Sequence, residues 1–316
     1  MKLRIGHLST FYHTAILLMA DKEISGELGA EVEWRLFGTG PAIVNAFEKD
    51  ELDLAYIGLP PAIIGIARGV RIKCIAGGHM EGTVIAGPKR FMGFPETDDI
   101  ETVLRQFIGL KIGVPGKGSI HDVIIKQYLE RYHLGGEIEI INFQWADLVT
   151  EAVVKGDVQA AVGTPALAAA VIRYADGRLL VPPSMIWPNN PSYGIVASNG
   201  LIKTEPELLE RFLLLHENAA AVLRERPDAA AGVISSYVGF VDRAFVSQVL
   251  GISPRYCAQL TDEYIACAME FVKTLQRLGY IGREVSSSEI FDHSLIRKIH
   301  PEKDHYRVNK DKVPER

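Results

Sequence analysis

Short apolar segments and segments of helical periodicity alternate along the first 88 residues. The apolar segments have the length of buried strands, and they are Leu3–His7, Val32–Phe37, Leu52–Ile57 and Ile72–Ala76. Small or polar residues follow each of them. Strands that alternate with helices predict an α/β fold with a parallel sheet. Because ligands bind at the carboxyl ends of such strands, the pattern predicts a small-molecule site built from these loops.

The same alternation restarts after a polar segment at 95–101. The second set of strands is expected at Lys111–Val114, Glu137–Ile141 and Val158–Val162. The helices between and after them are expected at His121–Tyr132, Leu148–Lys155 and Ala166–Tyr174. Beyond the final strand, predicted at Tyr193–Ser198, helical periodicity dominates, and Thr204 with Glu207 predicts a capping box that opens a long helix.

Two successive repeats of this kind predict two α/β lobes. The chain would cross between them near Gly87-Pro88 and again near Ser184–Pro191, so that the second lobe is inserted into the first. We expect residues 1–88 plus 190–300 to form lobe 1, with a helical C-terminal segment, and residues 89–189 to form lobe 2. Residues 301–316 are expected to form a loose tail. Two lobes on two crossings make a clamshell that can close on a ligand.

Composition narrows the classes of function. The 316 residues carry a net charge of −5, whereas a nucleic-acid binder usually presents a basic face, so we expect no nucleic-acid partner. The cysteines Cys74, Cys257 and Cys267 show no CxxC spacing, which favours core thiols over a disulfide framework or a zinc site. No spacing such as HExxH joins the histidines. We therefore expect neither a metal nor another cofactor.

The cellular compartment is left open by the sequence. No apolar run reaches the roughly 18 residues of a membrane-spanning helix, so we expect no stable membrane insertion. Met1 stands one residue before the first predicted strand, and no secretory signal is recognisable. As written, the sequence predicts a cytoplasmic protein. A periplasmic or cell-surface location is expected if a leader has been removed.

Several segments resemble the solute-binding proteins of ABC importers for nitrate, alkanesulfonates and taurine, a superfamily that includes thiamine-pyrimidine synthesis proteins. The resemblance rests on Leu28–Trp34, Phe37–Pro41, Leu52–Gly58 with Pro60-Pro61-Ala62, Lys111–Val114 with Gly118-Ser119, and Leu278–Ile281. It covers most of residues 2–300. It implies a type II periplasmic-binding-protein fold, with an ABC permease and an ATPase as partners.

Four strand-to-helix junctions are candidate ligand contacts, because free amides and the dipole at a helix N-terminus attract anions. These candidates are Thr39, Gly58 with Leu59, Gly118 with Ser119, and Thr164. The alternative is that they only cap helices or form tight turns. If the junctions of both lobes converge on one cleft, they favour an anionic or strongly polar ligand.

Further candidates follow other predicted strands or lie at the second crossing. Thr10 and His13 come after the first strand, and His79 and Glu81 come after the fourth. The second crossing carries Trp187, Asn189 and Tyr193, an aromatic-and-amide group that could close over a ligand. A structural role is the alternative for each: a lone histidine is often a structural donor, and a tryptophan in a proline-fixed crossing is often buried.

Two hypotheses about function follow. The leading one is a monomeric binding protein that captures a small polar ligand of the sulfonate, nitrate or carboxylate class for ABC-type import. The alternative is a cytoplasmic enzyme on the same fold, a lyase or a pyrimidine-synthesis-like protein, in which His13, His79 and Glu81 act as acid or base. No GxSxG or other nucleophile motif supports covalent catalysis.

Overall fold

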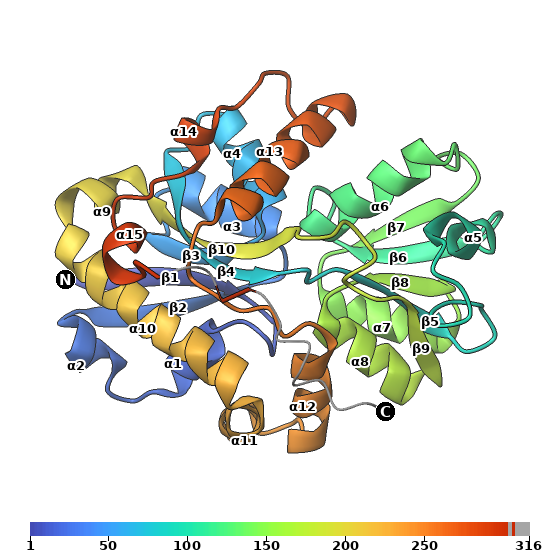
Figure 1. Cartoon of the computed structure of the whole chain (residues 1–316), viewed down its shortest axis with the longest axis horizontal. Coiled ribbons are helices and arrows are strands. Elements are labelled where there is room, and N and C mark those ends of the chain that lie inside the picture. Colours follow the sequence, from blue (N-terminus) through green and yellow to red (C-terminus); the bar gives the residue numbers. More distant parts are fainter. Residues whose placement is uncertain (303–304, 307–316) are drawn as a thin grey trace.

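Two five-stranded sheets form the frame of the protein in the computed structural model, which describes residues 1–302, 305 and 306 (Figure 1). The first sheet has the order β2-β1-β3-β10-β4, with β1 (Lys2–Leu8), β2 (Glu31–Phe37), β3 (Leu54–Ile57), β4 (Ile72–Met80) and β10 (Pro191–Ser198). The second sheet has the order β7-β6-β8-β5-β9, with β5 (Val84–Pro88), β6 (Lys111–Pro115), β7 (Glu139–Phe143), β8 (Ala160–Gly163) and β9 (Gly177–Val181).

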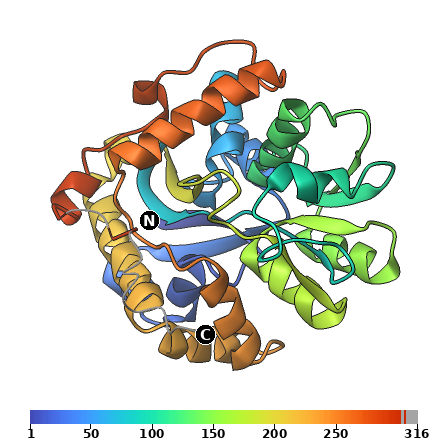
Figure 2. The ribbon, with the colours of Figure 1, turned by 45° about the vertical axis from the view of Figure 1, so that its right-hand side comes forward.

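Helices pack around both sheets (Figure 2). The first lobe contains α1 (Ala15–Ala20), α2 (Ile24–Leu28), α3 (Gly40–Glu48) and α4 (Leu59–Ala67). The second contains α5 (Ile100–Arg105), α6 (Ile120–Arg131), α7 (Ala146–Lys155) and α8 (Pro165–Tyr174). The helices that follow β10 are α9 (Asn199–Thr204), α10 (Pro206–Glu225), α11 (Pro227–Val238), α12 (Arg243–Ile252), α13 (Asp262–Arg277), α14 (Ser287–Ile290) and α15 (Ile296–Ile299).

The two sheets share one topology, which confirms the α/β clamshell with an inserted second lobe. In the first sheet, β1 runs parallel to β2 and β3, while β10 is antiparallel to β3 and β4. In the second, β6 runs parallel to β7 and β8, while β5 is antiparallel to β8 and β9. The sheets are therefore mixed: four strands of each run in one direction, as expected, and one strand, β10 or β5, runs against them. The antiparallel strand in each sheet is the one that the chain forms on arriving from the other lobe.

The first crossing lies earlier in the chain than the sequence suggested. Val84–Pro88 pairs with β8 and β9 of the second sheet, so the chain passes between the lobes at 81–83 and not at Gly87-Pro88. Gly87 does not break the strand, because it pairs with Arg178 of β9. The division into 1–88 plus 190–300 and 89–189 stays a prediction. The strand pairing favours moving its first boundary to before Val84.

Strand β4 is longer than expected, and this changes the position of His79. The pair Gly77-Gly78 was expected to end the strand, but β4 continues to Met80. A Cβ atom at Gly78 would lie 2.1 Å from the ring of Tyr193, so glycine lets the β10 side chain lie flat on the β4 backbone. His79 is therefore paired with Tyr193 inside the sheet and does not stand in a loop.

One expectation about the C-terminal third is wrong, and a second does not hold at Tyr306. Thr204 does not cap the long helix α10, because it belongs to α9 and its hydroxyl donates to the carbonyl of Gly200. Within the tail at 301–316, residues 303–304 and 307–316 lie outside the described residues. Tyr306, which is described, is not loose: it is buried, and its hydroxyl donates to the carbonyl of Cys257 at 2.6 Å.

A buried carboxylate joins the two lobes. Asp122 in α6 is fully buried and accepts hydrogen bonds from the backbone N–H of Gly118 at 2.8 Å and from Nδ2 of Asn142 at 3.0 Å. Lys126, one turn along the same helix, pairs with it at 2.9 Å. The hydroxyl of Tyr280, which follows α13 of the first lobe, also donates to it. Removing the charge of Asp122 should weaken the hydrogen bonds that several buried donors make to it.

Asp122→Asn should lower the free energy of unfolding by about 2 kcal/mol, because an amide can accept fewer of these bonds and no longer neutralises Lys126. Urea unfolding followed by circular dichroism measures this. The matched control is Glu101→Gln, which breaks the exposed pair with Arg105 and should change stability by less than about 0.5 kcal/mol. Equal effects of the two substitutions would contradict a special role for Asp122.

Candidate ligand-binding site

A cavity of about 50 Å³ lies between the two lobes, where the carboxyl ends of their strands meet. One water molecule needs roughly 10–15 Å³ on this measure, so the cavity has room for a group of a few non-hydrogen atoms. Its lining comes from both lobes: Leu8, Ser9, Thr10, Tyr12, His13, Gly38, Thr39, Gly40, Gly58, Pro61 and Ser192 from the first, and Pro115, Ser119, Ile120, His121, Ala146 and Thr164 from the second.

Five helices begin at this cavity. The residues immediately before α3, α4, α6 and α8 all line it, and they are Thr39, Gly58, Ser119 and Thr164. Ala146, the first residue of α7, lines it as well. The first N–H groups of a helix have no partner inside the helix, and the helix dipole adds partial positive charge there. The cavity is therefore lined with hydrogen-bond donors and favours an anion.

The hydroxyl oxygens of the capping side chains accept hydrogen bonds from N–H groups of the helices that they cap. Thr39 accepts from the N–H of Ala42, Thr164 from Leu167 and Ser119 from Asp122. The hydroxyl of Ser119 also donates to the carbonyl of Pro115 at 2.6 Å, so its proton is not aimed at the cavity. These side chains therefore act as helix caps, which was the structural alternative. Each one contributes to a ligand site by fixing the position of a helix N-terminus.

Two buried polar atoms of the lining have no hydrogen-bond partner among the described residues. They are Oγ1 of Thr10 and Nδ1 of His13. A buried polar atom without a partner costs free energy of the order of 1–3 kcal/mol. Because both residues face the cavity, a ligand that bonded to these atoms would recover that cost.

The histidines at the cavity are uncharged near neutral pH. Burial holds the pKa of His13 well below its usual value, with the nearby His79 as a smaller cause. Burial lowers the pKa of His121 to about 4, and its Nδ1 lies 2.9 Å from the hydroxyl of Thr83. None of the described lining residues is Lys or Arg. Any anion here would thus be held by neutral donors and helix dipoles, without an ion pair.

The lobes touch at the rim of the cavity. A Cβ atom at Gly38 of the first lobe would lie 2.4 Å from the carbonyl oxygen of Gln144 of the second. A Cβ atom at Gly116 of the second lobe would lie 2.7 Å from the side chain of Thr39 of the first. Only glycine permits these approaches. The structure therefore represents a closed arrangement of the two lobes.

The structure brings six of the sequence-predicted residues to this cavity: Thr10, His13, Thr39, Gly58, Ser119 and Thr164. Gly118 lies beside it, where its N–H is bonded to Asp122, and it lines a separate surface pocket with Lys117 and Tyr280. Leu59 is fully buried in the first turn of α4. Neither of these two residues lines the cavity.

The remaining predicted residues have structural partners elsewhere. The Nε2 atom of His79 lies 2.6 Å from the carbonyl oxygen of Ser253, and the hydroxyl of Tyr193 accepts from the N–H of Thr14. Both rings nevertheless pack near the site, since Tyr193 lies 4.0 Å from the ring of His13 and His79 lies 5.1 Å from the ring of Tyr12. They form a layer of aromatic rings behind the lining.

Glu81, Trp187 and Asn189 fix the crossings between the lobes. Glu81 pairs with Arg255 at 2.6 Å and accepts from the N–H of Asn189 at 2.9 Å. Trp187 is buried, donates from Nε1 to Cys267 Sγ at 3.1 Å and packs against Phe271. These contacts give each residue a structural role and none of the three lines the cavity.

Sequence reasoning missed four polar residues of the lining: Ser9, Tyr12, His121 and Ser192. Tyr12 and Ser192 are within hydrogen-bond distance across the site, with 3.3 Å between their hydroxyl oxygens. The signal for His121 was present, because it stands in the first turn of the helix that Ser119 opens. Ser192 could have been found as the first hydroxyl after the second crossing.

Comparison with known proteins places the chain in context. A model of the NMT1-like family matches residues 1–237. A Brucella abortus chain described as a binding protein is 25% identical over 247 residues, which is 76% of this chain and 72% of that one. The taurine-binding periplasmic protein of Escherichia coli is 26% identical over 206 residues, which is 63% of this chain and 59% of that protein.

Solved structures confirm the fold. The periplasmic aliphatic sulphonate binding protein of Escherichia coli superimposes with a TM-score of 0.76 and 15% identity, covering 99% of this chain and 98% of that one. At this identity the likeness concerns the fold. None of the helices in the described part of the chain combines the length and apolar character needed to span a bilayer.

The buried histidines should make stability depend on pH. Burial lowers the pKa of His79 to about 3 and that of His121 to about 4, from a usual value of 6.5. Between about pH 6.5 and 4 the unfolded chain binds protons that the folded chain does not. Stability should therefore fall with decreasing pH, by about 1.4 kcal/mol per pH unit for each such histidine.

The comparison of two variants isolates this effect in urea unfolding between pH 7 and 4.5. His121→Asn should reduce the slope, while His133→Asn, at an exposed position, should leave it unchanged. An identical slope in His121→Asn and the unsubstituted protein would contradict the assignment.

Proposed function

We propose that this chain, which belongs to the NMT1-like family, captures a small anionic solute between its lobes and delivers it to an ABC-type importer. The observation that carries the proposal is the convergence of five helix N-termini on one interlobe cavity. The names of the relatives, a binding protein and a taurine-binding periplasmic protein, support capture over the enzyme alternative.

The chemistry of the lining favours a weakly hydrated anion with several acceptor oxygens, such as a sulfonate, nitrate or a carboxylate. Free N–H groups at the starts of α3, α6 and α7 can each donate to a different oxygen. The absence of Lys and Arg among the described lining residues disfavours multiply charged anions, whose desolvation would need ion pairs. Thr10 and His13 supply two additional polar atoms.

Ligand release requires the lobes to separate. The cavity is lined from both lobes, and the close contacts at Gly38 and Gly116 hold its rim shut. The two crossings at 81–83 and 182–190 are the positions where a hinge can act. The closed protein with its solute and the open, empty protein would then differ in shape. A permease could recognise the closed shape. A permease and an ATPase are the partners this role implies, and a periplasmic location follows if the chain is exported.

Enzyme activity through His13, His79 and Glu81 is the weaker candidate. Glu81 is committed to Arg255 and the N–H of Asn189, and His79 is bonded to a backbone carbonyl within the sheet. Of the three, His13 alone lines the cavity. An acid–base pair that shares one site is therefore not assembled by these residues.

A small sulfonate, nitrate or carboxylate should raise the melting temperature and be recovered unchanged. At about a hundred times its dissociation constant, a ligand adds about 2.7 kcal/mol to the stability of the folded state. Thr10→Val should weaken binding about tenfold in isothermal titration, because it removes one hydrogen bond worth about 1.4 kcal/mol. Thr204→Val, on the exposed surface of α9, is the matched control. Conversion of the compound would refute capture in favour of catalysis.

Gly38→Ala should hold the lobes apart, because the added methyl group would collide with the carbonyl oxygen of Gln144 in the closed state. We expect the variant to fold, to show a larger radius of gyration in small-angle X-ray scattering with ligand present, and to bind at least about tenfold more weakly. Gly282→Ala, where a methyl group meets nothing within 4 Å, should behave like the unsubstituted protein. Unchanged affinity in Gly38→Ala would argue against closure.

A further inference from the structure

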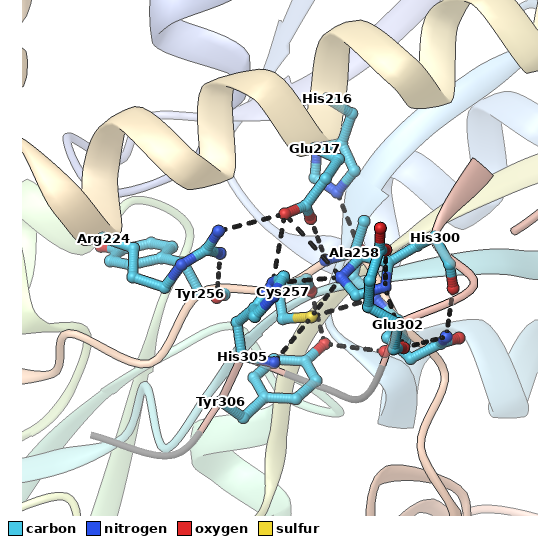
Figure 3. Close-up of polar contacts among 12 residues, drawn as sticks. His216, Glu217, Arg224, Tyr256, Cys257, Ala258, His300, Glu302, His305 and Tyr306 are labelled. Carbon is cyan, nitrogen blue, oxygen red and sulfur yellow. Dashed lines mark hydrogen bonds and ion pairs between the residues drawn. The ribbon is translucent and has the colours of Figure 1, made fainter. Parts of the chain in front are cut away.

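Three side chains with soft or borderline metal-binding atoms meet on the first lobe, beneath α10 (Figure 3). They are Cys257, His300 and His305, and one ligand atom from each lies within 4.8 Å of the others. Cys257 and His300 are buried, whereas the side chain of His305 is 39% exposed. None of the three lines the interlobe cavity. In the described part of the chain, no other group of three such residues is this close.

Two of the three distances between these atoms match the edges of a metal tetrahedron. Nε2 of His300 lies 3.1 Å from Nδ1 of His305 and 3.4 Å from Sγ of Cys257. Zinc binds nitrogen at about 2.0–2.1 Å and sulfur at about 2.3 Å, so a tetrahedral site spaces two nitrogens by about 3.3 Å and a nitrogen and a sulfur by about 3.5 Å. The third pair, Sγ of Cys257 and Nδ1 of His305, lies within 4.8 Å. A small movement of the His305 side chain would let one ion contact all three atoms.

The surrounding hydrogen bonds orient the ligand atoms inward. Nδ1 of His300 lies 3.2 Å from the carbonyl oxygen of Glu302, which can only accept, so the proton of this ring resides on Nδ1. The lone pair of Nε2 then faces Cys257 and His305. Sγ of Cys257 accepts from the backbone N–H groups of Gln259 and His305, both at 3.4 Å. Such outer contacts are the ones that fix metal-bound histidine and thiolate.

A carboxylate completes the group. Glu217 points from α10 toward the histidines, with Oε1 at 3.9 Å from Nε2 of His300 and 3.6 Å from Nδ1 of His305 (Figure 3). Its other oxygen accepts from the N–H of Ala258 at 2.8 Å, which anchors the side chain. An oxygen donor or a water beside it can occupy the fourth position of a tetrahedral site.

We propose that Cys257, His300 and His305 bind one zinc ion, with its fourth position facing Glu217. Sulfur and imidazole ligands in a tetrahedral arrangement select zinc over magnesium or calcium. The ligands come from two parts of the chain, the segment that pairs with β4 through the Tyr256–His79 bridge and the segment after α15, and helix α10 supplies the neighbouring Glu217. The ion would link the segment that carries His300 and His305 to the first lobe. This inference does not rest on the proposed function.

The test uses the full-length chain without a histidine tag, kept reduced and freed of metal with a chelator. Zinc titration against a chromophoric indicator should show one ion per chain. Cobalt titration should produce a thiolate-to-metal charge-transfer band together with the strong visible bands of a tetrahedral ion. Cys257→Ser should abolish the charge-transfer band, and His305→Ala, at the half-exposed ligand, should weaken zinc binding at least about tenfold.

The matched controls are Cys267→Ser, at a buried thiol bonded to Trp187, and His293→Ala, at a histidine outside the cluster. Both should bind zinc and cobalt as the unsubstituted chain does. The proposal is overturned if the unsubstituted chain binds no stoichiometric zinc. It is also overturned if Cys257→Ser retains the charge-transfer band, or if Cys267→Ser loses it.

Discussion

The backbone N–H groups at the starts of five helices are the constraint on which the rest of the structure depends. Each helix follows a strand of one of the two sheets, so the sheet topology aims their first turns at the same point. Buried N–H groups need acceptors. Capping oxygens satisfy one group in each of α3, α6 and α8, α4 and α7 have no side-chain cap, and the groups left over lie at the interlobe cavity. One anion with several acceptor atoms can accept hydrogen bonds from several of these N–H groups at once.

The closed form depends on the same arrangement. Glycine at positions 38 and 116 lets the lobes approach until the donors of both sides surround one small volume. Asp122 adds a contact that links the lobes, since it neutralises Lys126 of the second lobe and accepts from Tyr280 of the first. The neutral state of His13 and His121 is consistent with a site that holds an anion by hydrogen bonds and dipoles, with no formal positive charge to balance it.

The sequence predicted the elements well where local signals decide the structure. Thr39, Ser119 and Thr164 were expected at helix starts, and each is an N-cap that lines the cavity, because a hydroxyl before a helix serves both roles. The predicted strand ended before Gly77-Gly78, whereas β4 continues to Met80. Nothing in the local sequence shows that Tyr193 packs on Gly78 and Tyr306 on Gly77.

Residues whose roles depend on distant partners could not be predicted in this way. Glu81 and Trp187 were expected to contact a ligand, but Arg255 and Cys267, far along the chain, engage them. The cluster of Cys257 with His300 and His305 was not predicted from the sequence for the same reason. The cysteine was expected to be a core thiol, and it is buried, yet the H-x₄-H spacing of His300 and His305 becomes meaningful only once the fold brings the three together.

The most direct test of the account is a titration of isotope-labelled protein with a small sulfonate such as taurine, with nitrate and acetate in parallel, followed by backbone amide resonances. The account predicts saturable shifts of the amides of Gly40, Ile120, His121 and Ala146, at the helix starts that line the cavity. Saturable shifts confined to residues away from these helix starts, or no saturable shift with any of the three anions, would contradict it.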